Sequence, residues 1–294
     1  MIPMLARSKT GLAACRATLR PPVVLIPTMG ALHEGHRVLL RRGRQIAGSH
    51  GALVVSVFVN TLQFGAGEDL DRYPRTLSED LAVCAEEGVD VVFAPSHEQM
   101  YPAEQMITVR PGAMGEVLEG TFRPGFFDGV LTVVLKLFNL VKPDVAIFGE
   151  KDAQQLAVVR RMVADVNLPV TIEPAGIVRD ADGLAISSRD RYLSPAERDT
   201  ALALSRALRA GVAAAGAGQE AVLAAAGAEL AAASKADPPL VTDYLALTDP
   251  ASFRSVPAGF AGQALLLVAA TVGKTRLIDN MALEIAPRHP RSAP

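Results

Sequence analysis

Two histidines lie three positions apart in the segment IPTMGALHEGH, Ile26–His36. An imidazole can ligate a metal, transfer a proton or donate a hydrogen bond to a phosphate oxygen. Zinc proteases carry H-E-x-x-H, whereas this segment reads H-E-G-H, and neither a third ligand cluster nor a Walker A loop occurs in the chain. Gly30 and Gly35 permit close approach of the backbone to a ligand. The segment therefore favours a phosphate-binding loop over a zinc site, and a capped helix with incidental histidines is the plain alternative.

Two later segments also carry cationic and hydroxyl groups. IFGEKDAQQL, Ile147–Leu156, places Lys151 where a strand meets a helix, so that its ammonium can face a phosphate; an ordinary junction with a surface lysine explains it equally well. GLAISSRDRYL, Gly183–Leu193, places Ser187, Ser188 and Arg189 in a row, which suits a loop that closes on a triphosphate or a polar linker.

Side-chain amides and carboxylates complete the set of polar groups. Asn60 and Gln63 follow a strand in VSVFVNTLQF, Val55–Phe64, and suit a small hydroxy acid better than another phosphate. An acidic stretch follows, consisting of Asp69, Asp71, Glu79 and Asp80. It could hold Mg²⁺, but a solvated helix face is the favoured interpretation.

The elements that must position these groups alternate between strand and helix. The predicted strands are Val23–Ile26, Leu53–Val59, Val89–Phe93, Val145–Phe148 and Val170–Ile172, and the predicted helices are His36–Ile46, Thr76–Glu87, Val130–Val141 and Asp152–Asp165. Short β-branched runs between helices indicate βαβ units and a doubly wound parallel sheet of the α/β class, covered on both faces. Ligands of such sheets bind outside the carboxyl ends of the strands.

The pattern changes after Val178–Arg198. Ser194, Pro195 and Glu197 mark a helix start. Beyond it we expect two Ala-rich helices within Ala201–Ala236, broken near Gly216–Gly218, then strands at Thr242–Leu247, Ala264–Gly273 and Thr275–Ile285, and a frayed end at Pro287–Pro294. The chain thus divides into a domain of residues 1–177 and a smaller α+β domain of residues 178–294.

Composition limits the function classes. A formal net charge of −2 over 294 residues predicts neither a nucleic-acid nor an anionic-membrane partner, and Ala264–Val272 is too short to span a bilayer. Cys15 and Cys84 form no metal or disulfide pattern and are expected to be reduced. The basic stretch before Val23 predicts a short amphipathic helix rather than a transit peptide.

These segments together resemble the pantoate–β-alanine ligase (pantothenate synthetase) family. The resemblance rests on PTMGALHEGH, SVFVNTLQFGAGEDLDRYPRT, GVLTVVLKLFNLVKPDVAIFGEKDAQQL and VRDADGLAISSRDRYL, runs from about Val23 to Arg198, and continues more loosely to Ile285. The family belongs to the nucleotidyltransferases, whose H-x-G-H loop is shared with class I aminoacyl-tRNA synthetases. The resemblance implies a Rossmann-like domain that binds ATP and pantoate, a C-terminal lid domain, and a cytoplasmic homodimer.

The reaction it implies has two steps. Pantoate and ATP, with Mg²⁺ on the phosphates, give pantoyl adenylate and pyrophosphate, and β-alanine then displaces AMP to form pantothenate. By position, the catalytic residues are His36, as proton donor, with His33, Lys151 and Arg189. The ATP-binding residues are Met29, Gly30, Ala31, Leu32, His33, Glu34, Gly35, His36, Gly149, Glu150, Lys151, Asp152, Val178, Ile186, Ser187, Ser188 and Arg189. The substrate-binding residues are Asn60, Gln63, Gln155 and Tyr73.

The chain departs from the family pattern at four positions. Thr61 replaces a proline, Phe126 a histidine, Ala153 a tyrosine and Asp190 an asparagine, and none of these changes removes a phosphate-binding residue. Two other interpretations stay open at this stage: another adenylylating nucleotidyltransferase of the same fold, and a non-catalytic nucleotide-binding regulator.

Overall fold

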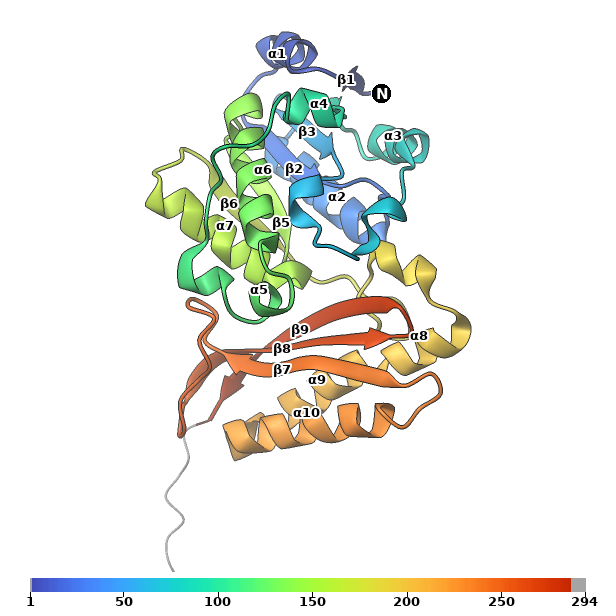
Figure 1. Cartoon of the computed structure of the whole chain (residues 1–294). Helices are drawn as coiled ribbons and strands as arrows, with labels where there is room; N and C mark the ends of the chain where they lie inside the picture. Colours follow the sequence, from blue (N-terminus) through green and yellow to red (C-terminus); the bar gives the residue numbers. More distant parts are fainter. Residues whose placement is uncertain (1, 287–294) are drawn as a thin grey trace, which may run out of the picture. The chain divides into compact units, whose positions relative to one another are not determined.

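The computed structural model describes residues 2–286, which fall into two compact units (Figure 1). The first unit ends at Val178 and the second begins at Arg179. The binding of ATP and pantoate by the first unit, and the lid role of the second, stay predictions.

The first unit is built on a six-stranded parallel sheet in the order β1-β4-β3-β2-β5-β6. Its strands are β1 (Met4–Ala6), β2 (Val23–Thr28), β3 (Ala52–Val57), β4 (Val91–Phe93), β5 (Val145–Gly149) and β6 (Thr171–Ala175). From β2 the chain adds β3 and β4 on one side, and then returns to place β5 on the other side of β2. The order reverses between β2 and β5, so the region outside the carboxyl ends of these two strands is the expected ligand site.

Helices cover both faces of this sheet. They are α1 (Lys9–Thr18), α2 (Glu34–Ala47), α3 (Leu77–Glu86), α4 (His97–Met100), α5 (Glu119–Phe122), α6 (Phe126–Val141) and α7 (Ala153–Asp165), with short 3₁₀ turns η1 (Thr61–Gln63), η2 (Asp69–Asp71), η3 (Gly112–Gly115) and η4 (Glu150–Asp152). Side chains of β2 alternate between two cores: Val23 and Leu25 pack with α6 and α7, and Val24 and Ile26 pack with α2 and α3.

The second unit has one antiparallel sheet and its own core. Its elements are η5 (Ser188–Tyr192), α8 (Pro195–Ala201), α9 (Ala203–Ala213), η6 (Ala215–Ala217), α10 (Gln219–Ala233), β7 (Leu240–Thr248), β8 (Gly262–Val272) and β9 (Thr275–Ile285), with strand order β7-β8-β9. Ser194 caps α8 in a capping box with Glu197. The α+β prediction and the break near Gly216–Gly218 are confirmed.

The predicted fold class is confirmed, with local corrections. The five predicted parallel strands are present within a few residues of their expected ends. Strand β1, which pairs in parallel with β4 at the sheet edge, is absent from the prediction. Helix α2 begins at Glu34 and not at His36. The frayed end predicted at Pro287–Pro294 lies outside the described residues.

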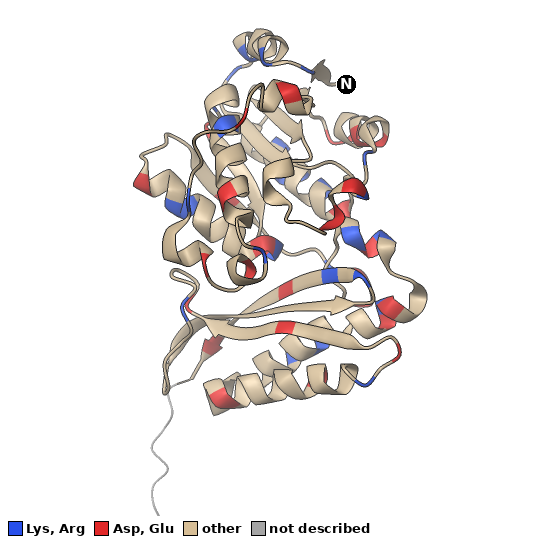
Figure 2. Cartoon of the chain, in the orientation of Figure 1, with Lys and Arg blue, Asp and Glu red and all other residues tan. Residues whose placement is uncertain are grey.

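Charge is spread without a dominant sign in the view of Figure 2, where basic and acidic residues are interspersed along the elements. Of the helices between residues 2 and 286, none has the length and apolar character needed to cross a membrane. Both cysteines are free, and burial raises the pKa of Cys84 to about 12.

Candidate functional site

The two histidines lie at the switch point of the sheet, because the loop that carries them follows β2. His33 is the N-cap of α2, and its ring centroid lies 4.1 Å from that of His36. A Cβ added at Gly35 would lie 2.9 Å from Cε1 of His33, so any larger residue at this position would clash with the His33 ring. Lys151 follows β5, the strand that pairs with β2, and its charge acts on His36. The structure therefore brings His33, His36 and Lys151 together.

His36 is neutral and its tautomer is fixed. Burial, the neighbouring His33 and the Lys151 charge lower the pKa of His36 to about 3. The backbone N–H of His33 donates to Nδ1 of His36 at 3.3 Å. Because Nδ1 accepts, the single proton of the neutral ring is on Nε2. His36 thus presents an N–H donor to a ligand.

The turn between β2 and α2 is left-handed and is held from α3. Gly30 and Ala31 have φ of 84° and 52°. The carboxylate of Asp80 accepts hydrogen bonds from the backbone N–H of Ala31 at 3.2 Å and of Leu32 at 2.8 Å. Burial raises the pKa of Asp80, and these two hydrogen bonds oppose that rise. The solvated helix face predicted for Asp80 is wrong, since this residue is only 2% exposed.

Sequence reasoning did not detect the burial of Asp80, because two adjacent acidic residues read as one solvated patch. Only its neighbour Glu79 is in fact exposed. The signal was present in the helical spacing, since Asp80 shares a buried helix face with Cys84. Within residues 2–286, no group of three or more His, Cys, Asp or Glu side chains is placed to hold a metal ion.

The side-chain amides form a second cluster beside the histidine loop. Asn60 Nδ2 donates to Gln63 Oε1 at 2.9 Å and to the carbonyl of Gly129 at 3.1 Å. Tyr101 donates its hydroxyl to Asn60 Oδ1 at 2.7 Å, and burial raises its pKa. Gln63 Nε2 in turn donates to the sulfur of Met29, a weak acceptor, at 3.3 Å. The histidine loop and the amide cluster are thus in contact, and Tyr101 is a member of the amide cluster that sequence reasoning missed.

The other two predicted substrate residues, Tyr73 and Gln155, lie outside the hydrogen bonds described for the amide cluster. Tyr73 is buried and meets Phe64 edge-on, with centroids 6.0 Å apart. Gln155 lies half-buried in the first turn of α7. Its neighbour Gln154 is buried and structural, because it donates to the carbonyls of Met114 and Val117 at 2.8 Å each.

The predicted triphosphate loop of the second unit is ordered by its own contacts. Ser187 caps η5, and its backbone N–H donates to Asp190 Oδ2 at 2.6 Å. Arg179 donates to both carboxylate oxygens of Asp279, at 2.6 and 2.9 Å. Ser188 is buried, while Ile186, Ser187 and Arg189 are half-buried. Of the predicted ATP-binding residues, Val178 ends the first unit and Ile186–Arg189 belong to the second.

Two of the four departures from the family pattern, Phe126 and Asp190, have local partners. Phe126 is buried, and the guanidinium of Arg123 lies 3.7 Å above its ring centroid. Arg123 also donates to Glu68 and to the carbonyl of Gln63. Asp190, where the family pattern has asparagine, accepts the hydrogen bond from the backbone N–H of Ser187 in the capping box of η5.

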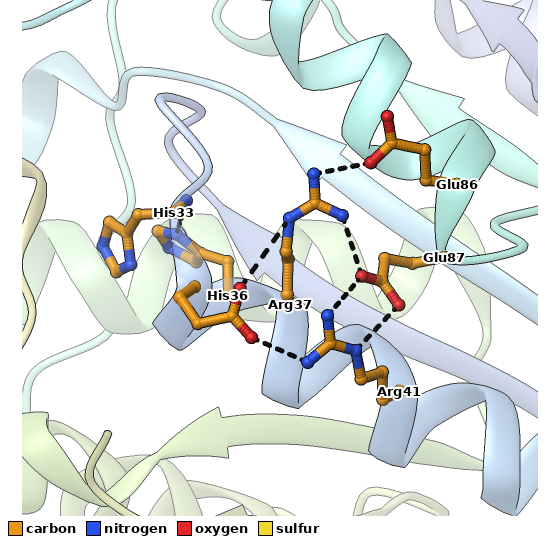
Figure 3. A network of polar contacts seen from close by, with 7 residues as sticks. His33, His36, Arg37, Arg41, Glu86 and Glu87 are labelled. Atoms are coloured by element: carbon orange, nitrogen blue, oxygen red, sulfur yellow. Dashed lines mark hydrogen bonds and ion pairs between the residues drawn. The ribbon is translucent and has the colours of Figure 1, made fainter. Parts of the chain in front are cut away.

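An ion-pair network joins the start of α2 to the end of α3 (Figure 3). Arg37 donates to Glu86 at 2.6 Å and to Glu87 at 2.8 Å, and Arg41 donates to Glu87 at 2.9 Å and to Glu34 at 2.7 Å. Burial opposes ionisation of Glu87, but the hydrogen bonds from both arginines outweigh it and lower its pKa. The network fixes the helix that carries His36 against α3.

The chain is similar to known proteins over nearly its whole length. The family model described as pantoate-beta-alanine ligase matches residues 4–282. A pantothenate synthetase of Thermobifida fusca (strain YX) is 60% identical over 289 residues, 96% of this chain and 96% of the relative.

Solved structures of the same family match this chain as well. A crystal structure of pantothenate synthetase from Thermus thermophilus matches with a TM-score of 0.87 at 44% identity, covering 97% of this chain and 100% of that one. A pantoate-beta-alanine ligase from Francisella tularensis, crystallised with "beta-gamma ATP" and β-alanine, matches with a TM-score of 0.78 at 29% identity, covering 95% of this chain and 97% of that one. This chain belongs to the pantoate–β-alanine ligase family.

Proposed function

We propose that this chain condenses pantoate with β-alanine to pantothenate, using ATP through a pantoyl-adenylate intermediate, and that His33, His36 and Lys151 form its triphosphate site. The observation that carries the proposal is the grouping of two imidazoles and an ammonium at the switch point of the sheet, with His36 neutral and its Nε2–H available as a donor. The family relationship supplies the reaction.

In the first step, a carboxylate oxygen of pantoate attacks the α-phosphorus of ATP. The new O–P bond forms as the bond from the α-phosphorus to the bridging oxygen of pyrophosphate breaks, so negative charge grows on the leaving group. This step needs no proton transfer, only positioning and charge stabilisation. A neutral His36 suits that requirement, because it donates a hydrogen bond without giving up its proton. We therefore assign His36 charge stabilisation in place of proton donation.

Magnesium enters as part of the substrate, MgATP. It screens the phosphates, while the side chains of His33, His36 and Lys151 contact them. By family position, Ser187, Ser188 and Arg189 contact the triphosphate, and Val178 and Ile186 contact the adenine side. The predicted contacts of Met29–Gly35 and Gly149–Asp152 with ATP belong to the same proposal, except at the backbone N–H groups of Ala31 and Leu32, which donate to Asp80.

For pantoate, the amide cluster offers Gln63 as the adaptable member. Both N–H groups of Asn60 are engaged inside the protein, whereas among residues 2–286 the Nε2 group of Gln63 donates only to the thioether of Met29. A hydroxyl or carboxylate oxygen is a stronger acceptor than a thioether sulfur. Gln63 is therefore proposed to bind pantoate directly and Asn60 to hold Gln63 in place, with Gln155 and Tyr73 as the other proposed contacts.

In the second step, the neutral amine of β-alanine attacks the acyl carbon of the adenylate, AMP leaves, and the amine loses a proton. The acyl group is already activated, so proximity is the main requirement. Exclusion of water protects the adenylate from hydrolysis.

The experiment that tests this function follows the products with each substrate omitted in turn. Pyrophosphate release should require ATP and pantoate, and AMP and pantothenate should accumulate only when β-alanine is also present. Formation of a dinucleotide product would indicate another nucleotidyltransferase, and ATP binding without turnover would indicate a regulator. A homodimer in the cytoplasm, as the family resemblance implies, stays a prediction that sedimentation and fractionation can test.

A further inference from the structure

A buried carboxylate that the proposed mechanism does not use lies directly behind the nucleotide loop. Asp80, on α3, is 2% exposed, although aspartate is almost never fully buried without partners. Each of its two oxygens accepts one hydrogen bond from consecutive backbone N–H groups of the loop: Oδ2 from Ala31 and Oδ1 from Leu32. The hydroxyl of Thr76 is 3.5 Å from both oxygens.

The loop conformation around this carboxylate is one that binds anions. Successive backbone N–H groups that follow a left-handed turn form a concave recess for an anion. Gly30 and Ala31 supply the left-handed turn, and a Cβ added at Gly30 would lie 2.9 Å from Asp80 Oδ2. The recess is therefore already filled, from within the protein, by the carboxylate of Asp80.

We propose that Asp80 is a positioning residue for adenylation: its carboxylate fills the amide recess of Ala31 and Leu32 as an internal anion, fixes the turn that leads into His33 and His36, and keeps that recess from taking a phosphate of ATP. The triphosphate is thereby directed to His33, His36 and Lys151. The inference deepens the proposed function and rests on it.

The helix that carries this carboxylate is also tied to the helix that follows the turn. Glu86 and Glu87, at the other end of α3, pair with Arg37 and Arg41 in the first turns of α2 (Figure 3). Helix α3 therefore contacts both the turn before α2 and α2 itself. Loss of the Asp80 carboxylate frees the turn while the α2–α3 contact remains, so the effect should fall on the histidine loop.

The test compares Asp80→Asn, Asp80→Ala and Glu79→Gln in pantothenate formation with MgATP. Asparagine keeps the volume but turns an NH₂ group toward one of the two backbone N–H donors. A displacement of about 1 Å at a catalytic group can cost about 10²-fold in rate, so we expect Asp80→Asn to lower kcat/KM for ATP by about that factor. Glu79→Gln removes an exposed carboxylate from the adjacent position and should match the wild type.

Chemical rescue separates positioning from packing. In Asp80→Ala, formate should enter the vacated recess and restore part of kcat, while chloride at equal ionic strength should not. Amide hydrogen exchange at Leu32 should be faster in both Asp80 variants and slow again in Asp80→Ala with formate.

Wild-type kinetics in Asp80→Asn would overturn the inference, as would a loss in Asp80→Ala that formate leaves unchanged. If Asp80→Ala does not fold, Asp80→Asn decides alone. A wild-type chain that makes no pantothenate contradicts the proposed function itself, whereas an active wild type with an equally active Asp80→Asn contradicts only the role of Asp80.

Discussion

At the scale of single residues, the charge state of His36 determines what chemistry its loop can perform. A histidine with an ordinary pKa near 6.5 would be a mixture of imidazole and imidazolium at physiological pH. Burial and two cationic or potentially cationic neighbours, His33 and Lys151, keep His36 neutral, and the backbone N–H of His33 sets its tautomer. Of His36 and Lys151, only Lys151 then brings a cationic charge to the triphosphate, so the two residues have distinct roles.

Lys151→Ala should lower kcat strongly while the fold is retained. Removal of one preorganised donor at a site of developing charge typically costs about 10²–10³ in kcat, or about 2.7–4 kcal/mol. Steady-state kinetics with saturating pantoate and β-alanine, together with circular dichroism of the variant, measure this. Lys235→Ala removes an exposed lysine from the second unit and is the matched control. A kcat within a few-fold of the wild type would exclude Lys151 from the triphosphate site.

The neutral state of His36 predicts a pH dependence of stability. The pKa of His36 is about 3 in the folded chain and about 6.5 when unfolded, so between these values only the unfolded chain binds the proton. The contribution of the neutral His36 ring to the free energy of unfolding is fully present above about pH 6.5. It is lost as the pH falls, by on the order of 3 kcal/mol at about pH 4.

Urea unfolding of the wild type and of His36→Gln across this pH range isolates that contribution, because glutamine does not titrate. The free energy of unfolding of the wild type should fall more steeply with acid than that of the variant. Parallel pH profiles for the two proteins are the outcome that would contradict a neutral His36 with a lowered pKa.

At the scale of elements, the sequence predicted what depends on local pattern and missed what depends on distant contacts. The apolar strand that became β2 and the glycine-flanked loop after it carry their own signals, and the five predicted parallel strands are present. Strand β1 is three residues long and forms only because it pairs with β4, about ninety residues away in the chain. Asp80 is likewise buried only by the fold, since its partners Ala31 and Leu32 precede it by 49 and 48 residues.

The close approach of η1 to α6 gives a prediction at this scale. A Cβ at Gly129 would overlap the carbonyl of Leu62 and lie 2.6 Å from the backbone nitrogen of Gln63. Gly129→Ala should therefore displace η1 and destabilise the chain by about 1–3 kcal/mol. Because η1 carries Gln63, kcat/KM for pantoate should fall more than kcat/KM for ATP.

The matched control for this substitution is Gly216→Ala, since a Cβ at that position meets nothing within 4 Å. Its melting temperature and both kcat/KM values should equal or slightly exceed those of the wild type. Equal losses for pantoate and ATP in Gly129→Ala would argue against the assignment of Gln63 to pantoate.

At the scale of the whole molecule, the two units have separate hydrophobic cores. Every residue of the cores on the two faces of the parallel sheet precedes Val178, and the core of the second unit runs from Leu184 to Ile285. A segment with its own core can in principle fold alone. The proposed site residues are also divided, with His36 and Lys151 in the first unit and Arg189 in the second.

Each unit expressed alone should therefore fold, but neither should be a full enzyme. Residues 179–294 should unfold in one cooperative thermal transition, because they contain a complete hydrophobic core, and residues 1–178 should bind ATP through His33, His36 and Lys151. Turnover by the first unit should be low, since Arg189 is missing, and Arg189→Ala in the full chain should show how much of that loss comes from one guanidinium. Calorimetry of each unit and adenylate formation by the first measure these outcomes. Full activity in residues 1–178 would remove the second unit from the chemistry, and a non-cooperative transition in residues 179–294 would show that its core needs the first unit.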